Sequence, residues 1–410
     1  MKTTLKILAF LFTVCAAANA QVVPAATGPG GLPLRSSLQY ALRYSETYQM
    51  NGGFSDMQTA TTSGSLAYSN SDQRLPFMMN YVGGYTWTIT GPSYETGQFH
   101  RLLLSQGIAW RKWKIMASDD VSYLPQSPIT GFSGIPGIGE PIGGPSPVPA
   151  TSQTILAQNT HVVDNVAMGE VEHDLSYATT LSASGSSELL RYPDANGLNT
   201  DSLSAIAELT RRLDARNSLF GRFMFSGFSY PDFSVTIQTN AGYLGYKHQW
   251  SRTLTTDVSA GPQWIEGTEN ATVPNSTNVS VNAAINYLQR FTSASLSYRR
   301  GVTGGAGYLL GAEVDTVNGD FSREFGRNLT MGLTAGYNRT SGLNNNGVTI
   351  AKYGGAQATW RLGRKMIVFA NYTGTDQTSS STLPTNALGQ LLQVISFGVG
   401  YSPRQTIQRQ

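Results

Sequence analysis

The sequence has one cysteine and few charged residues. Cys15 is that cysteine, and it lies in a leader that we expect to be cleaved, so the mature chain would carry no thiol or disulfide chemistry. Secreted eukaryotic domains are more often stapled by disulfides, so a long exported chain without them fits a bacterial, Gram-negative envelope better. Charged residues make up 13% of the chain, which is about half the usual share for a soluble protein.

Long apolar runs and basic clusters are also missing. Beyond the leader, no apolar run approaches the roughly 18 residues that indicate a transmembrane helix. The net charge is only +3 and shows no basic cluster, which argues against nucleic acid as a partner. Mean hydropathy is −0.19, while 44 glycines, 20 tyrosines and many Ser, Thr and Asn residues are present. Strands that meet lipid on one face and water on the other need such a composition.

The N-terminus has the three parts of a secretory signal peptide. Lys2 and Lys6 precede an apolar stretch from Ile7 to Cys15, and Ala18-Asn19-Ala20 forms a small-x-small cleavage site. The apolar stretch is too short to cross about 30 Å of hydrocarbon as a helical anchor. We therefore expect a signal peptide over residues 1–20 and a periplasmic segment over residues 21–35.

A turn motif recurs along the second half of the chain. Each copy carries an arginine after an apolar or aromatic residue, and an alternating run follows it. The arginines are Arg216, Arg252, Arg290, Arg327 and Arg364, separated by 36 to 38 positions. A fixed period of this size indicates a repeat architecture.

Two repeat architectures have a period of this length. A β-propeller blade has four short strands and therefore three breaks per repeat. Here each repeat has one further break, which is longer and rich in Gly, Asn, Pro or Ser. These breaks run from Glu266 to Ser276, Gly301 to Gly311, Ser341 to Gly347 and Gln377 to Gln390. Two strands of about 12 residues, one short turn and one longer loop form the hairpin unit of an outer-membrane β-barrel, which we favour over the propeller.

The expected strands alternate with a period of two residues. After Arg327, one face carries Leu329, Met331, Leu333, Ala335 and Tyr337, and the other carries Thr330, Gly332, Thr334, Gly336 and Asn338. Such alternation gives one apolar and one polar face. A soluble sandwich alternates too, but its strands are usually about five or six residues long.

Counting hairpins back from these turns gives about 18 strands, with 16 as the alternative if a weak upstream strand is an insertion. An even number places both chain ends on the periplasmic side, together with the short turns. The sequence therefore predicts an all-β protein, a closed antiparallel transmembrane barrel over residues 36–401 in the cell outer membrane. A polar tail over residues 402–410 follows it.

One segment does not fit a membrane strand. Residues 124–159 contain seven prolines and many glycines, a composition that excludes a central strand. The segment falls on the outer side by our count. It is either a flexible surface loop or an insertion that occludes the lumen or mouth.

Chemical motifs are nearly absent. We find no nucleophile elbow, phosphate-binding loop, zinc-protease motif or cysteine pair, and we expect no enzyme activity, cofactor or metal. His100 and His161 open expected strands at the outer end. An outer-rim hydrolase that uses one of them with Asp164 or Glu95 is a minor alternative, because a positioned His–carboxylate pair can activate a nucleophile.

Charges on polar strand faces are the candidate functional residues. We expect a lumen lining that includes Arg222, Arg299, Arg339, Glu170, Glu208 and Asp320. Such charges either set the selectivity of a pore or pair with one another inside the barrel.

The repeated hairpins, with an arginine-bearing turn followed by small and apolar residues in alternation, resemble a family of bacterial outer-membrane barrel proteins. Some members accompany exopolysaccharide or exosortase loci. The resemblance covers roughly residues 160 to 401 and implies a barrel and a link to envelope polysaccharide. Many such barrels end on a terminal Phe, whereas the last expected strand here closes at Tyr401.

These features predict a porin-like channel for passage or export of polar solutes, saccharide among them. A barrel of 16–18 strands is wide enough for an aqueous channel. The alternative from another class is a structural or surface-interaction barrel with an occluded lumen. The expected partners are the lipid bilayer, the barrel-assembly machinery, and polysaccharide or small polar solutes.

Overall fold

The computed structural model describes twelve stretches of the chain. They cover residues 36–51, 56–70, 74–91, 96–125, 161–193, 197–267, 273–305, 308–326, 328–344, 347–363, 365–380 and 391–402. The expected signal peptide, periplasmic segment and most of the polar tail lie outside these residues, as does nearly all of the Pro/Gly-rich segment. No helix in the stretches above is long and apolar enough to cross a membrane.

Eighteen β-strands of 11 to 16 residues fill the described part of the chain. They are β1 (Ser36–Asn51), β2 (Met57–Asn70), β3 (Phe77–Thr90), β4 (Gly97–Trp110), β5 (Trp113–Pro125), β6 (His161–Asp174), β7 (Thr179–Arg191), β8 (Thr200–Arg212), β9 (Asn217–Tyr230), β10 (Val235–Gln249), β11 (Leu254–Gly267), β12 (Ser276–Gln289), β13 (Thr292–Thr303), β14 (Ala312–Phe325), β15 (Leu329–Gly342), β16 (Val348–Leu362), β17 (Met366–Ser379) and β18 (Leu391–Tyr401).

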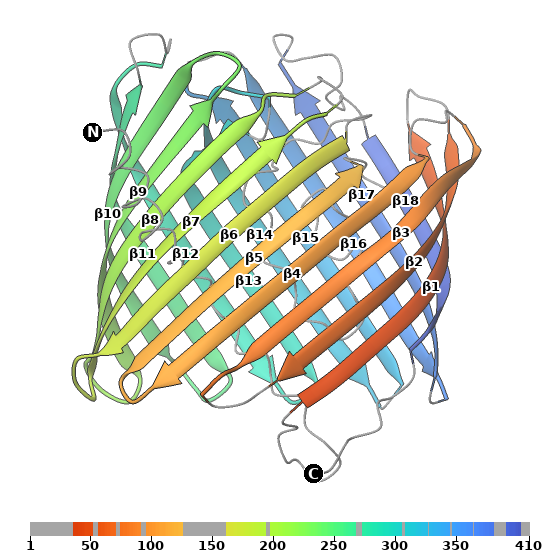
Figure 1. The fold of residues 1–410 in the computed structure, drawn as a ribbon, viewed down its shortest axis with the longest axis horizontal. Helices are drawn as coiled ribbons and strands as arrows, with labels where there is room; N and C mark the ends of the chain where they lie inside the picture. The colour runs from red at the N-terminus through yellow and green to blue at the C-terminus, as the bar shows by residue number, and fades with distance from the viewer. Residues whose placement is uncertain are drawn as a thin grey trace.

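The strands form one closed antiparallel sheet (Figure 1). Each strand pairs with its neighbours in the chain, and β1 closes the ring on β18, with Leu42 opposite Tyr401 and Asn51 opposite Leu392. Closure leaves no strand edge, which matters because lipid offers no hydrogen-bond partner to a free backbone group. The expected closed barrel of 18 strands is confirmed, and the alternative of 16 strands is wrong.

The connections after the even-numbered strands are two to four residues long, except for the six residues between β2 and β3, whereas those after the odd-numbered strands have four residues or more. In the β8–β9 turn, the Asp214 carboxylate accepts hydrogen bonds from Asn217 Nδ2 (2.5 Å) and from the backbone N–H groups of Arg216 (2.7 Å) and Asn217 (2.9 Å). These bonds, that of the Asn217 side chain first, hold the pKa of the Asp214 carboxyl below its usual value. Two of the repeat arginines, 327 and 364, lie outside the described residues.

Both ends of the barrel wall lie on the short-turn side. The backbone N–H of Ser402, just after β18, donates to the carbonyl of Lys365 in the β16–β17 turn (2.7 Å). β1 starts at the same end, because it runs antiparallel to β18. The short turns and both wall ends therefore share one side, as the sequence predicts, and the assignment of that side to the periplasm stays a prediction.

The outward face of the wall is a belt of exposed apolar side chains. Leu333 is 58% exposed and Leu244 is 81% exposed, although a large apolar side chain in a soluble protein is usually buried. Trp110, Trp250 and Trp360 stand exposed at the short-turn ends of their strands, where an amphipathic ring suits the headgroup region. An apolar band with an aromatic girdle is the outer surface of a membrane-spanning barrel.

Candidate functional site

The lumen is lined by the opposite face of the same strands. On β15, Leu333 is exposed on the outward face, whereas Asn338 and Thr340 on the other face are nearly buried. Further buried polar side chains on lumen positions of β16 to β18 include Thr349, Thr373, Thr375, Gln377 and Ser396. This half of the wall therefore offers mainly hydroxyl and amide groups and few charges.

Hydrogen bonds hold this polar half of the lining in place. Tyr353 Oη donates to Asn318 Oδ1 (2.5 Å), and Thr316 Oγ1 donates to Asn338 Oδ1 (2.9 Å). Asp320 accepts from Thr334 Oγ1 (3.0 Å). Because strand neighbours bind these groups, their positions are fixed relative to the wall.

The lumen face of β4 to β9 is charged instead. Arg101 Nη2 and Asp120 Oδ2 are 2.5 Å apart, and Lys114 Nζ lies 2.6 Å from Glu172 Oε1. Carboxylates outnumber cations here, because Asp164, Glu170 and Glu188 occupy the same face. The lumen therefore has a charged, mainly acidic half and a polar half with few charges.

Glu208 and Arg222 face each other across β8 and β9. Their side chains pair at 2.6 Å between Arg222 Nη2 and Glu208 Oε2, and both are about a quarter exposed or less. Arg222 Nε adds a second bond of 2.7 Å to the same oxygen, and its guanidinium also lies over the Phe220 ring, 5.2 Å from the centroid. A two-bond contact of this kind fixes the guanidinium orientation.

Arg299 on β13 extends into the same region of the lumen. It lies within electrostatic range of Arg222 and of Tyr243, whose hydroxyl donates to Ser280 Oγ (2.9 Å). Within the described stretches, Arg299 forms no ion pair. Its guanidinium is thus available to a solute group that accepts hydrogen bonds.

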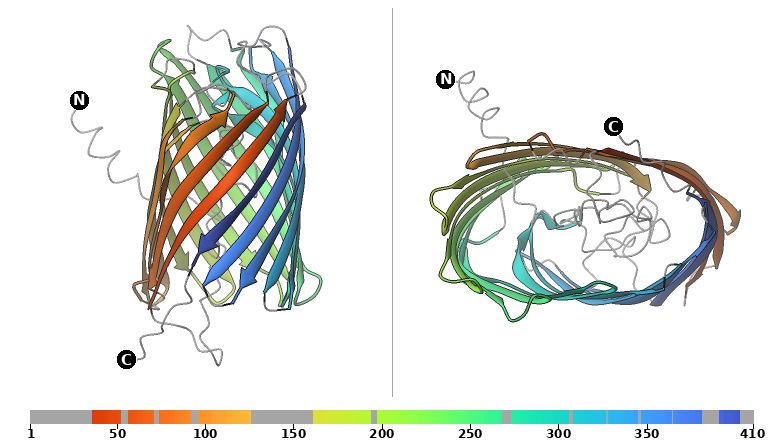
Figure 2. Two further views of the ribbon diagram at one scale, coloured as in Figure 1. Left: turned by 90° about the vertical axis from the view of Figure 1, so that its right-hand side faces the viewer. Right: turned by 90° about the horizontal axis from the view of Figure 1, so that it is seen from below.

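The connection between β13 and β14 folds into the lumen at the loop end. Gly304 lies beside Phe228 and Thr200, which belong to β9 and β8, and the rings of Tyr308 and Tyr192 are 6.1 Å apart. Figure 2, in the view along the barrel, shows this cyan part of the chain inside the ring of strands. The connection therefore crosses part of the pore and narrows the opening on this side.

Tyr230 anchors that connection. Its side chain is fully buried, its hydroxyl donates to the carbonyl of Gly304 (2.9 Å), and it accepts from the N–H of Gly311 (2.7 Å). A buried apolar cluster of Phe228, Val235, Ile237, Ile265, Val273 and Val302 surrounds it. Gly305 and Gly311 have φ values of 78° and 69°, which glycine adopts without steric cost.

The six expected lumen residues are not all together. Glu208, Arg222 and Arg299 meet in one region, Glu170 lies on the charged half and Asp320 on the polar half. Arg339 shares its strand face with Met331 and Leu333 and lies 3.6 Å from Asp315. Because strand alternation places Arg339 on the outward face, we leave it out of the lumen lining.

The structure does not bring the hydrolase candidates together. His100 is on the outward face of β4, where Nδ1 lies 2.9 Å from Tyr81 Oη. His161 stacks on Tyr123 with 5.6 Å between ring centroids, and Asp164 lies on the lumen face of β6. Glu95 falls outside the described residues. Among the described residues, no group of three or more His, Cys, Asp or Glu side chains is placed to hold a metal ion.

Sequence reasoning missed the inward connection. The glycines of Gly301 to Gly311 predict an outer loop, whereas the structure places part of this segment inside the barrel. One signal was available, since Tyr308, Leu309 and Leu310 form an apolar run that an exposed loop would not need. All but Leu310 of these are buried in the structure, as expected for a loop that packs inside the barrel.

Comparisons with known proteins gave matches in structure only. No protein-family model and no curated protein matches the chain. Among solved structures, Acinetobacter baumannii OccAB4 aligns with TM-score 0.48 and 10% identity over 90% of this chain and 98% of that one. Pseudomonas aeruginosa OccK2 (OpdF) aligns with TM-score 0.48 and 11% identity over 90% and 97%, and its complex with glucuronate with 0.47 and 12% over 90% and 98%. The fold assignment rests on the strand register described above.

Proposed function

We propose that the protein is an outer-membrane channel that lets small polar solutes, including small saccharides, cross passively. The observation that carries this proposal is the closed wall of 18 strands with an apolar outward belt and a polar lumen face. A barrel of this strand number is wide enough to enclose an aqueous path.

The lining suits uncharged solutes with many hydroxyl groups. The wall of β14 to β18 presents Thr, Ser, Asn and Gln side chains, which both donate and accept hydrogen bonds. The opposite wall presents ion pairs, such as Arg222–Glu208, that a sugar can bridge without either charge being left unpaired. The proposal is non-enzymatic and needs no cofactor. Polysaccharide as a passenger and the barrel-assembly machinery as a partner are further predictions.

A structural or surface-interaction barrel is the rival function. One observation favours it, because the β13–β14 connection crosses part of the lumen and is tied down by Tyr230. If the remaining path is closed as well, the barrel would serve to display its loops rather than to conduct.

Cysteine accessibility in planar bilayers separates the two functions. The only native cysteine lies in the expected leader, so a cysteine introduced into the barrel would be the only thiol of the mature chain. A charged, membrane-impermeant thiol reagent should reduce the conductance of Thr334→Cys, whose side chain faces the lumen, and leave Ala335→Cys on the outward face unchanged. Absence of conductance in the unmodified protein and in both variants would reject the channel and support the structural barrel.

A further inference from the structure

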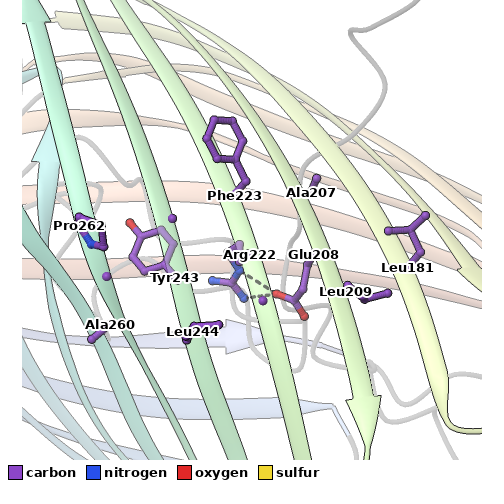
Figure 3. A pocket seen from close by; sticks show the side chains of 13 residues that line it. Leu181, Ala207, Glu208, Leu209, Arg222, Phe223, Tyr243, Leu244, Ala260 and Pro262 are labelled. Atoms are coloured by element: carbon purple, nitrogen blue, oxygen red, sulfur yellow. Dashed lines mark hydrogen bonds and ion pairs between the residues drawn. The ribbon is translucent and has the colours of Figure 1, made fainter.

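A groove interrupts the apolar belt on the outward face of β7 to β11. Its floor is made by residues with little or no side chain, Ala207, Gly221, Gly242 and Ala260, on four adjacent strands. A side chain at Gly242 would meet no atom within 4 Å, so this part of the floor is open space. The cavity has a volume of about 550 Å³ and is drawn in Figure 3.

Large apolar side chains stand around this floor. Leu209, Phe223 and Leu244 are 48%, 52% and 81% exposed and border the groove on the same outward face. The groove lies toward the short-turn end, because Leu209 is three residues from the end of β8 and Leu244 is five residues from the end of β10. By the topology above, this half of the belt faces the periplasmic leaflet.

The lining of the groove favours an occupant that is apolar and conformationally flexible. Water is disfavoured because the lining offers almost no polar partners, and an empty groove forfeits the dispersion contacts of the atoms around it. Lipid tails are the medium at this depth of the belt. A tail can enter an irregular depression by changing rotamers, which a rigid ring system cannot do.

A cation lies where the headgroup of such a lipid would be. Arg211 is on the same strand face as Leu209, two residues toward the periplasmic end of β8, so its Cα is about 7 Å lower along the strand. It is exposed and forms no ion pair with any described residue. Exposed Tyr246 and Trp250 lie toward the same short-turn end of β10 and mark the interface, where aromatic rings prefer to lie.

We propose that this groove holds one acyl chain of a phospholipid from the periplasmic leaflet, with the lipid phosphate bound by Arg211. Guanidinium groups recognise phosphate through charge-assisted hydrogen bonds, and the chain supplies the apolar contacts. The site is separate from the lumen and does not depend on whether the barrel conducts.

Native mass spectrometry of the detergent-purified barrel tests this site. The probe is phosphatidylglycerol, titrated against a chain-matched diacylglycerol that lacks the phosphate. We expect one phospholipid to bind more tightly than the rest. Gly242→Leu should weaken that binding roughly tenfold, because filling the floor removes about two methylene groups of chain burial.

Two further variants separate the chain contact from the phosphate contact. Arg211→Gln should abolish the preference for phosphatidylglycerol over diacylglycerol while chain binding remains. Gly354→Leu is the matched control, because Gly354 is outward on β16 and an added Cβ there would have its nearest neighbour, the Thr334 carbonyl oxygen, at 3.8 Å. It should bind lipid as the native protein does.

The proposal is overturned by either of two results. Equal phospholipid binding in the native protein, Gly242→Leu and Gly354→Leu would show that the groove is not the site. A dimer that the Gly242→Leu substitution dissociates would show that a second barrel fills the groove instead. Mobility of unheated and heated samples in electrophoresis establishes that every variant is folded before binding is compared.

Discussion

The Tyr230 hydroxyl donates a hydrogen bond to the backbone carbonyl of Gly304, which lies 74 positions away in the chain. Tyr230 ends β9, whereas Gly304 follows β13, so three strands of the barrel wall, β10 to β12, lie between the two residues. The contact is possible only because the β13–β14 connection enters the lumen. The same hydroxyl accepts from Gly311, so one buried side chain ties both ends of the connection to the wall at β9.

Tyr230→Phe should loosen this connection. It leaves the Gly304 carbonyl and the Gly311 N–H unpaired in a buried place, at a cost of about 1–3 kcal/mol for each unsatisfied group. For a conducting barrel we expect a larger mean conductance or more frequent opening in single-channel records. Tyr372→Phe, which removes an exposed hydroxyl bonded to Gln393, should leave the records unchanged. Identical records for native protein and Tyr230→Phe would mean that the connection does not limit the pore.

An arginine should destabilise the barrel much more on the outward face of β15 than on its lumen face. Leu333→Arg places a charge in the apolar belt and should cost about 2–4 kcal/mol of folding free energy near the bilayer midplane. Thr334→Arg places it in the lumen beside Asp320, which Thr334 contacts in the native protein, and should cost far less. Urea titrations of the barrel in lipid vesicles measure both. Equal free-energy costs at positions 333 and 334 would show that the assignment of Leu333 to the lipid face and Thr334 to the lumen is wrong.

The wall and its facing could largely be predicted from the sequence, because both depend on local periodicity. Alternation along residues 329–338 separates Leu333 from Thr334, and the spaced turn arginines set the hairpin count. The same rule places Arg339 with Leu333, although its charge suggested the lumen; near the loop end of the strand the outward face can carry charge, and Asp315 is its partner there. The Tyr230–Gly304 contact could not be predicted, since it joins distant segments and no pattern near either residue encodes it.

The Arg222–Glu208 pair should influence ion selectivity if the lumen conducts. Glu208→Gln removes a carboxylate and leaves the cations of Arg222 and Arg299 in the same region, so the reversal potential should shift toward anion preference. Arg222→Gln should shift the reversal potential toward cation preference.

The pair Arg191–Asp201 (2.5 Å) lies on the outward face of β7 and β8, so Asp201→Asn is the matched control and should not change the reversal potential. Reversal potentials in a salt gradient across a planar bilayer measure all three variants. Shifts of the same sign for Glu208→Gln and Arg222→Gln would contradict a direct electrostatic role.

Two glycines that lie against each other on β10 and β11 should differ sharply in their tolerance of alanine. An added Cβ at Gly261 would overlap the carbonyl oxygen of Gly242, whereas one at Gly242 would meet nothing within 4 Å. The strands approach closely here, between the pairs Ala241–Gln263 and Leu244–Ala260, and Pro262 next to Gly261 has no N–H to donate to the strand pairing.

Gly261→Ala must therefore push the two backbones apart, at a cost of about 1–3 kcal/mol, the usual range for overpacking. Gly242→Ala adds a methyl group to an open apolar groove and should leave the free energy of unfolding nearly unchanged. Urea titrations of the two variants in the same vesicles compare them directly, and equal destabilisation would mean that the close approach of Gly261 to Gly242 is not present in the folded barrel.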